Sequence, residues 1–285
     1  MDRPSMAVPA SPMAFVVTGA TGAIGGAVAT ILAHQGHTVI LPVRNLPSGQ
    51  EVRARILQES PRSSVEVVGC DLSRMDSVRQ AAAAIVSTHS SLAGLIHCAA
   101  VFTKTRQVTL EGFELMFATN HLGPFLLTRE LLSSLQAGAP SRVVTVSAPS
   151  TTELDFDDLQ STQKFSSFGA FGATKTANLL FAYELARRSS GTNVTSNVFF
   201  PGVVKSKLMQ EAPAVVRGLA GLASKRPEEA GSALAWLATD PSLSQTTGQF
   251  FKLTKRSDSS GYSRDPGVQQ RLWAASERLV TNPAS

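Results

Sequence analysis

Short apolar runs alternate along the chain with longer stretches in which apolar residues recur every three or four positions. The short runs have the continuous apolar character of strands buried on both faces, and they occupy residues 14–18, 38–43, 65–70, 92–98, 142–147, 193–199 and 248–253. The helical pattern occupies residues 23–35, 49–59, 74–88, 119–136 and 168–188. This alternation predicts an α/β fold, a single doubly wound Rossmann-type domain whose central parallel sheet of about seven strands is flanked by helices.

The rhythm is interrupted at residues 200–226 and in the tail, and no repeat or low-complexity linker divides the chain. We expect a flexible leader over residues 1–13, a dinucleotide-binding domain over residues 14–255 and a C-terminal extension over residues 256–285. Residues 203–226 are largely apolar. They are expected to form a lid over a substrate pocket, although its individual apolar residues would fit a core helix equally well. A hydrophobic ligand of more than a few carbons is favoured.

Composition narrows the class of protein. Hydrophobic residues make up 43% of the chain and charged residues 16%, which allows a large core and argues against disorder. The net charge is +5, and the basic residues are scattered without interleaved aromatic residues, which favours a solvated surface over a nucleic-acid interface. The longest apolar runs are about ten residues, too short to span a bilayer. We therefore expect a cytoplasmic protein with no membrane span.

The two cysteines, Cys70 and Cys98, end strand segments that we expect to be adjacent and buried. Small buried apolar side chains are the favoured interpretation, because two cysteines do not make a disulfide framework. No metal site is expected.

The first predicted strand runs into a glycine-rich turn that opens the first helix. Gly19, Gly22 and Gly25 are spaced three residues apart there. The first glycine allows the tight turn, the second leaves room for a pyrophosphate, and the third lets the helix pack on the strand. The N–H groups at the helix N-terminus then face the phosphates. This position in the fold indicates a dinucleotide site far more strongly than glycine content alone.

The second predicted strand ends in Arg44 and Asn45, where an NAD site normally carries an acidic residue. A guanidinium can bind the 2′-phosphate through charge-assisted hydrogen bonds, whereas a carboxylate would repel it. The sequence therefore predicts NADP(H) in preference to NAD(H). Asp71, at the end of the third strand, is placed to bind the adenine amino group.

In these motifs the chain resembles the short-chain dehydrogenase/reductase family over about residues 14–253, closest to its retinol dehydrogenase, WW-domain oxidoreductase and protochlorophyllide reductase branch. The segments that carry the resemblance are Thr18–Gly25, Val43–Asn45, Cys70–Leu72, Gly112–Glu114, Asn120–Gly123, Asp157–Leu159, Lys175–Asn178 and Pro201–Val204. Motifs and resemblance together predict cofactor contacts from Gly19, Thr21, Gly22, Ile24, Gly25, Arg44, Asn45, Asp71, Leu72, Ala99, Lys175, Pro201, Gly202, Val204 and Ser206.

The resemblance also assigns roles. It implies that Asn120 supports a water relay and that Lys175 holds the nicotinamide ribose. It places Pro201–Val204 along the nicotinamide, with Ser206 near the carboxamide. Because members of the family commonly pair through their fourth and fifth long helices, it further implies a homodimer or homotetramer, unless the extra tail covers that surface.

Two positions depart from the family in their chemistry. Phe171 stands at the catalytic tyrosine, which protonates the carbonyl oxygen, and Ala148 stands at the serine that orients this oxygen. Ser147 precedes Ala148 on a strand, so its side chain should point to the opposite face and substitute poorly. A third departure puts His97-Cys98-Ala99-Ala100 at a motif of mainly structural role, and we interpret His97 as structural.

These departures leave several functions open. Loss of a positioned acid costs about 10²–10⁴ in rate, which weakens hydride transfer without forbidding it. The favoured hypothesis is an NADP(H)-dependent reductase of an apolar iminium, enone or carbonyl compound that works without the usual acid. The alternatives are a non-redox cyclase or isomerase in the same pocket and a catalytically silent NADP(H)-binding protein. An engineered Ser/Tyr knock-out of an ordinary reductase would show the same two residues.

Overall fold

One eight-stranded sheet forms the centre of the protein, in the order β3-β2-β1-β4-β5-β6-β7-β8. The computed structural model describes residues 13–204 and 225–281. The strands are β1 (Ala14–Thr18), β2 (Thr38–Val43), β3 (Ser64–Gly69), β4 (Gly94–His97), β5 (Ser141–Val146), β6 (Val194–Phe200), β7 (Phe250–Lys252) and β8 (Lys255–Ser257). All neighbours pair in parallel except β7 and β8. The predicted fold is confirmed, and an antiparallel edge strand is added to the seven expected.

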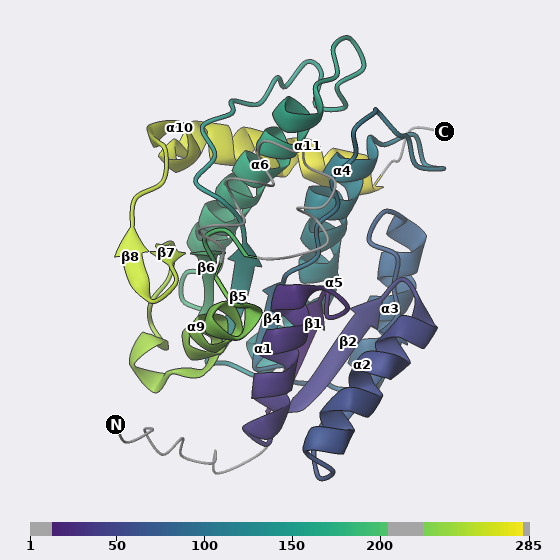
Figure 1. Ribbon diagram of the computed structural model, residues 1–285. Coiled ribbons are helices and arrows are strands. Elements are labelled where there is room, and N and C mark those ends of the chain that lie inside the picture. Colours follow the sequence, from purple (N-terminus) through teal and green to yellow (C-terminus); the bar gives the residue numbers. More distant parts are fainter. Residues whose placement is uncertain (1–12, 205–224, 282–285) are drawn as a thin grey trace.

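Helices connect the strands and cover both faces of the sheet (Figure 1). They are α1 (Ala23–His34), α2 (Leu46–Glu59), α3 (Met75–Thr88), α4 (Leu115–Phe117), the π-helical turn η1 (Ala118–Leu122), α5 (Gly123–Ala137), α6 (Ser167–Arg188), α9 (Pro227–Thr239), the short 3₁₀ turn η2 (Pro241–Leu243), α10 (Gly261–Arg264) and α11 (Pro266–Thr281). The sequence analysis did not predict α9, α10 or α11. For α9, Pro227 followed by Glu228 and Glu229 was an available helix-start signal.

Alternating strand residues divide the core into two layers. In β1, the side chains of Phe15 and Val17 pack with α1, α2 and α9, whereas Val16 packs with α3, α5, α6 and α11. In β5 the same alternation places Val143 in the layer with α3, α5, α6 and α11, and Val144 in the layer with α1, α2 and α9. The period of two is what a sheet buried on both faces requires.

The topology separates the two cysteines. Cys70 follows β3 and Cys98 follows β4, and β2 and β1 lie between these strands. The expectation of adjacent strands was therefore wrong. After β3 the chain crosses back over the sheet, and β4 pairs with β1 instead of β3. Both cysteines are free thiols; Cys70 is buried and Cys98 is half-buried.

The C-terminal tail packs into the same core as the rest of the chain. Trp273 of α11 lies 4.9 Å from the Phe125 ring of α5 and 6.0 Å from the Phe181 ring of α6, measured between ring centroids. Arg188 also lies over the indole, with its Cζ 4.5 Å from the ring centroid. The tail thus covers part of the surface of α5 and α6, through which the resemblance implied pairing.

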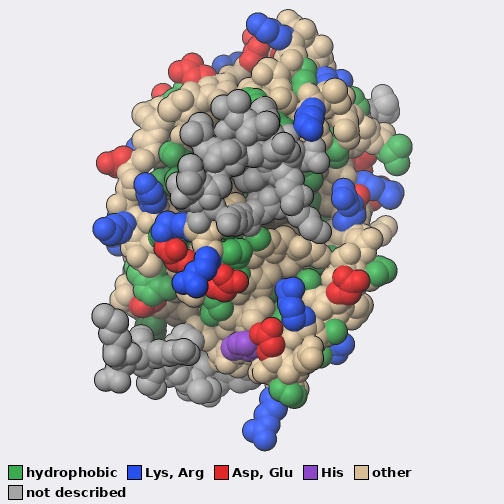
Figure 2. Space-filling view, viewed as in Figure 1, with side chains coloured by type: hydrophobic (Ala, Val, Ile, Leu, Met, Phe, Trp, Pro, Cys, Tyr) green, Lys and Arg blue, Asp and Glu red, His purple; other side chains and the backbone are tan. Residues whose placement is uncertain are grey.

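Lys, Arg, Asp and Glu side chains are interspersed over the coloured part of the face in Figure 2, without a continuous basic stripe. Within residues 13–204 and 225–281, no helix has the length and apolar character needed to cross a membrane.

The parallel strands bring the predicted site together. The segments named in the sequence analysis follow successive strands at the same carboxyl edge: Gly19 after β1, Arg44 after β2, Asp71 after β3, Ala99 after β4, Ala148 after β5 and Pro201 after β6. The strand order reverses between β1 and β4, and this switch point is where doubly wound sheets bind their ligands.

Candidate active site

The turn between β1 and α1 has no space for side chains. Gly19 has a φ of +70°, and a Cβ atom there would lie 2.7 Å from the Ala99 backbone. A Cβ atom on Gly25 would lie 2.3 Å from the Gly19 carbonyl oxygen. Gly22 is the N-cap of α1 and provides no side-chain acceptor for the first N–H groups of this helix. These groups are therefore left to an anion in front of the turn.

Thr18 fixes this turn against the end of β4. Its hydroxyl accepts from the backbone N–H groups of Cys98 and Ala99, at 3.2 and 3.3 Å. The altered motif at residues 97–100 thus keeps its backbone contact with the glycine-rich turn.

At the ends of β2 and β3 lie the residues predicted to select the nucleotide. Arg44 is exposed, and no carboxylate in the described parts of the chain pairs with it. Asn45 caps α2, its side-chain oxygen accepting from the Ser48 N–H at 2.9 Å. Asp71 accepts from the Ser73 N–H and hydroxyl through Oδ1, at 3.0 and 2.7 Å. Local hydrogen bonds therefore orient Asn45 and Asp71.

Phe171 and Lys175 occupy one face of α6, a turn apart. Lys175 is only 8% exposed, and its Nζ lies 5.0 Å from the centroid of the Phe171 ring. Burial lowers the pKa of Lys175 to about 8, and the nearby Cys98 opposes this shift slightly. Of the residues the structure describes, none accepts a hydrogen bond from this ammonium.

Two serines beside Ala148 donate their hydroxyl hydrogens to backbone carbonyls of α6. The Ser147 hydroxyl donates to the Lys175 carbonyl at 2.8 Å, and the Ser150 hydroxyl donates to the Gly172 carbonyl at 2.8 Å. These bonds hold the loop after β5 against the turn of α6 that carries Phe171. Neither hydroxyl is placed to substitute for a serine at position 148.

Asn120 lies in the π-helical turn η1 and is 1% exposed. Its side-chain oxygen accepts from the Val101 N–H at 2.8 Å, and its amide donates to the Val101 carbonyl at 3.0 Å and to the Thr174 hydroxyl at 3.2 Å. Asn120 therefore links the loop after β4 to α6; the predicted water relay stays a prediction. Inserted π turns of this kind are frequent at functional sites.

The two buried histidines near this region are neutral. Thr128 donates its hydroxyl hydrogen to Pro124, so His97, whose Nε2 lies 2.8 Å from that hydroxyl, must be the donor to it. His121 pairs in the same way with Ser276, at 2.8 Å. Burial lowers the pKa of each imidazole to about 3. Neither supplies a proton near neutral pH, and the packing of His97 agrees with a structural role.

An aromatic cluster that the sequence analysis missed surrounds position 171. The Phe102 ring lies 5.5 Å from the Phe171 ring, edge-on, and 5.3 Å from the Phe168 ring. Phe168 is 49% exposed, which is unusual for so large an apolar side chain. Phe102 lies about 70 residues before its partners, so local sequence gave no signal for this contact.

Pro201, Gly202 and Val204 follow β6 as expected, and Gly202 has a φ of +76°. The Lys225 N–H donates to the Val203 carbonyl at 2.8 Å, so the chain on either side of the undescribed segment is joined at this point. Ser206 and most of the predicted lid over residues 203–226 lie outside the described residues.

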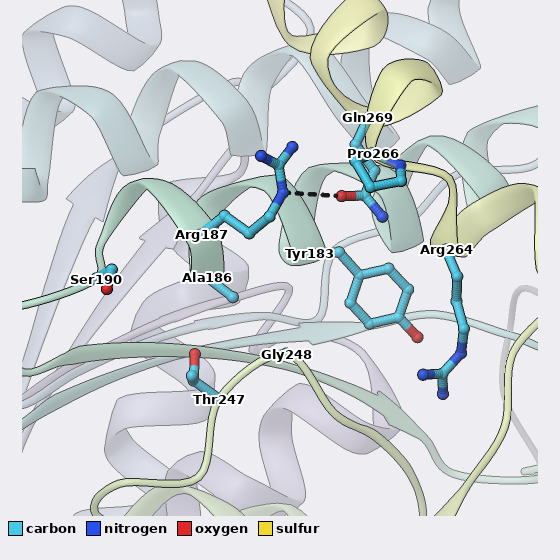
Figure 3. Close-up of a pocket in the computed structure, with 9 residues that line it drawn as sticks. All are labelled: Tyr183, Ala186, Arg187, Ser190, Thr247, Gly248, Arg264, Pro266 and Gln269. Carbon is cyan, nitrogen blue, oxygen red and sulfur yellow. Dashed lines mark hydrogen bonds between the residues drawn. The ribbon is translucent and has the colours of Figure 1, made fainter.

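A surface cavity of about 460 Å³ lies elsewhere, at the far end of α6 (Figure 3). Its arginines already have acidic partners: Arg187 shares Glu184 with Arg188, and Arg264 pairs with Asp258 at 3.1 Å. Arg187 also donates to Gln269 at 3.3 Å. Arg187 is twelve residues beyond Lys175 on α6, about 18 Å along a helix axis. This cavity is therefore separate from the cluster at the carboxyl edge of the sheet.

The comparison with known families agrees with this arrangement. The profile of the short chain dehydrogenase family matches residues 13–215. The chain belongs to the short-chain dehydrogenase family. This finding confirms the resemblance drawn from the motifs, and it makes the chain a member of an oxidoreductase family.

Named relatives extend over nearly the whole chain. Human retinol dehydrogenase 14 is 34% identical over 286 residues, covering 93% of this chain and 85% of that protein. Human polyprenol dehydrogenase is 35% identical over 273 residues, covering 92% and 83%.

Solved structures show the same fold. A crystal structure of an uncharacterized protein from Mycobacterium paratuberculosis superposes with a TM-score of 0.75, at 28% identity, over 94% of this chain and 93% of that one. A Burkholderia cenocepacia short chain dehydrogenase in complex with NADP has a TM-score of 0.68 at 19% identity, over 85% and 96%. At that level of identity the second likeness concerns the fold alone.

Proposed function

We propose that this protein is an NADP(H)-dependent reductase of an apolar, uncharged carbonyl or enone compound, working without the tyrosine and serine of its family. The observation that carries the proposal is the contrast within one site. The dinucleotide turn of Gly19, Gly22 and Gly25 is intact, while Phe171 and Ala148 replace the acid and its partner. The names of the retinol and polyprenol dehydrogenases support an apolar substrate.

The residues at the carboxyl edge fit a dinucleotide. The glycine-rich turn after β1 has no room for a Cβ atom at Gly19 or Gly25. The first N–H groups of α1 have no side-chain cap. Arg44 would meet the 2′-phosphate, Asp71 the adenine, and Lys175 the nicotinamide end. When bound, the cofactor supplies a hydride.

The protein's own contribution is orientation and exclusion of water. The Phe102, Phe168 and Phe171 rings provide an apolar wall beside the reaction centre, and Lys175 provides a positive charge over the Phe171 ring. Proximity and orientation can contribute on the order of 7–11 kcal/mol to the barrier, so a reaction can proceed with a weak acid.

The charge of Lys175 favours an uncharged substrate over an iminium ion. Two unit charges about 6 Å apart repel each other by about 3 kcal/mol at an effective dielectric constant of 20. Phe171 cannot offset this for a second cation, since the Lys175 ammonium already lies over its ring. A carbonyl or enone gains instead, because negative charge develops on its oxygen as hydride arrives.

Substitution of Arg44 tests the nucleotide. Arg44→Glu should weaken NADPH binding by roughly 10- to 100-fold and reverse the preference toward NADH, since a charge-assisted hydrogen bond contributes about 1.5–3 kcal/mol. Calorimetric titration with both cofactors measures this. Arg62→Glu makes the same charge change on an exposed residue just before β3, at the opposite edge of the sheet, and should leave both affinities unchanged. Equal affinity of the unaltered protein for NADH and NADPH would contradict the assignment.

Isotope transfer tests the reaction class. With NADPH deuterated at the transferable position, an apolar enone or ketone should acquire deuterium, and one NADPH should disappear per turnover. An iminium ion of matched shape should react more slowly. Product formed on NADP⁺ without label would instead identify a cyclase or isomerase, and the absence of turnover across the panel would favour a silent binding protein.

A further inference from the structure

Lys175 combines a low exposure, an ionisable group and hydrogen-bond donors that no described residue uses. It is 8% exposed, and no described oxygen accepts from its Nζ. The ammonium is held over the Phe171 ring at 5.0 Å, at the position where the family places its acid. Its three N–H donors have no acceptor among the described residues, so they are available to a ligand that reaches this ring.

We propose that Lys175 is itself the proton donor for this reduction, in place of the hydroxyl that Phe171 lacks. The assignment rests on the proposed function and adds a catalytic residue to it.

The neighbouring hydroxyl groups are excluded by their hydrogen bonds. Ser147, Ser150 and Thr174 each donate to a backbone carbonyl of α6, in each case at 2.8 Å. The two tyrosines donate elsewhere, Tyr183 to the Ser259 hydroxyl at 2.8 Å and Tyr262 to the Leu154 carbonyl at 3.5 Å. The protons of Ser147, Ser150 and Thr174 are therefore engaged by α6 and are not free for a substrate beside Phe171.

The protonation state of Lys175 is set by burial and by one neighbouring ionisable group. Cys98 is the group whose charge bears on the ammonium, but burial raises the pKa of its thiol to about 12, so it stays neutral. Burial lowers the pKa of Lys175 to about 8. Lys175 is then protonated at neutral pH and far more acidic than an exposed lysine, as a general acid should be.

The proton transfer balances without a further reactant. As hydride forms the new C–H bond, the π electron pair of the C=O bond moves onto oxygen. An N–H bond of the Lys175 ammonium breaks, and its proton forms the O–H bond of the product alcohol. The neutral amine left behind regains a proton from water before the next turnover.

The test is Lys175→Arg, which keeps the positive charge but not the acidity, because a guanidinium does not deprotonate in proteins. We expect NADPH affinity within a few-fold of the unaltered protein and a turnover number lower by about 10²–10⁴. In the unaltered protein, turnover should decline at alkaline pH with a pKa at or above about 8, because bound NADPH favours the ammonium; this decline should be absent from the residual activity of the variant. Lys255→Arg, on the exposed strand β8, is the matched control and should change neither quantity.

A readout without substrate accompanies this experiment. NADPH is anionic and should favour the ammonium, so binding near pH 8 should take up a proton, measured by calorimetry in buffers of different ionisation enthalpy. Lys175→Arg should abolish this uptake. If the larger side chain disrupts folding, Lys175→Ala should regain turnover with small alkylammonium ions, at rates that depend on the pKa of the amine.

The outcomes separate the two claims. Undiminished turnover and an unchanged pH profile in Lys175→Arg would overturn the donor assignment and leave the reductase standing. Failure of the unaltered protein to transfer label to any acceptor would overturn the reductase, and the donor assignment with it.

Discussion

Ala148→Ser combined with Phe171→Tyr should raise the reduction of aldehydes and ketones by up to about 10²-fold, because the phenol and the serine add a better placed acid to the proton that Lys175 supplies. The Phe171 ring is half-buried and lies one turn from Lys175. The change to tyrosine adds a single oxygen atom to a ring whose position is already fixed by α6. The ammonium beside this ring would lower the pKa of the new phenol. The serine would supply the hydroxyl that Ser147 and Ser150 cannot, because both donate to α6.

Steady-state rates with a panel of aldehydes and ketones measure the gain, and NADPH titration checks that the cofactor still binds. Phe168→Tyr is the matched control, since it adds the same hydroxyl one turn earlier on α6, on a ring that is 49% exposed. It should give no gain. If the double variant also gives none while binding NADPH, the pocket has been remodelled for a different reaction.

The effect of Lys175→Arg should depend on whether residue 171 carries a phenol. Once Phe171→Tyr supplies a phenol, Lys175 is no longer the nearest acid, so Lys175→Arg should cost much less in the double variant than in the unaltered protein. Such non-additivity is expected of two groups that serve one proton transfer. Equal losses in both backgrounds would indicate that Lys175 acts through the cofactor alone.

The sequence predicted most of the fold because its strands are short, apolar and regularly spaced. Helix α9 was missed although it begins with Pro227 and two acidic residues, since its many alanines give a weak apolar period. The order of strands depends on crossovers that no local pattern records, which is why Cys70 and Cys98 were assigned to adjacent strands. The tail was expected as an extension that could cover the pairing surface, but its packing needs Phe125 and Phe181, far away in sequence.

For the site, the sequence predicts that Phe171 and Ala148 stand at the family's tyrosine and serine, but it does not predict what surrounds these positions. Ser147 donates to the Lys175 carbonyl, 28 residues away in the sequence, and Asn120 accepts from the Val101 N–H, 19 residues away. The pKa of Lys175 is lowered by burial, which follows from packing and not from a motif. The glycine-rich turn differs, because its geometry is local and its spacing in the sequence already describes it.

Gly25→Ala should abolish useful cofactor binding through a single methyl group. The new Cβ atom would lie 2.3 Å from the Gly19 carbonyl oxygen and 2.6 Å from its carbon, and both are backbone atoms that no rotamer change can move. The turn must therefore shift, which displaces the N–H groups of α1 from the phosphates. We expect NADPH affinity to fall by about 10²-fold or more, and the free energy of unfolding to fall by about 1–3 kcal/mol.

Calorimetric NADPH titration and urea denaturation measure these two effects. Gly261→Ala is the control: a Cβ atom at the first residue of α10 meets nothing within 4 Å, so affinity and stability should both stay close to those of the unaltered protein. Native NADPH affinity in Gly25→Ala would exclude this turn as the phosphate site. Loss of affinity that exceeds the loss of stability would show that the turn is shaped for the ligand, because a packing defect alone would lower both together.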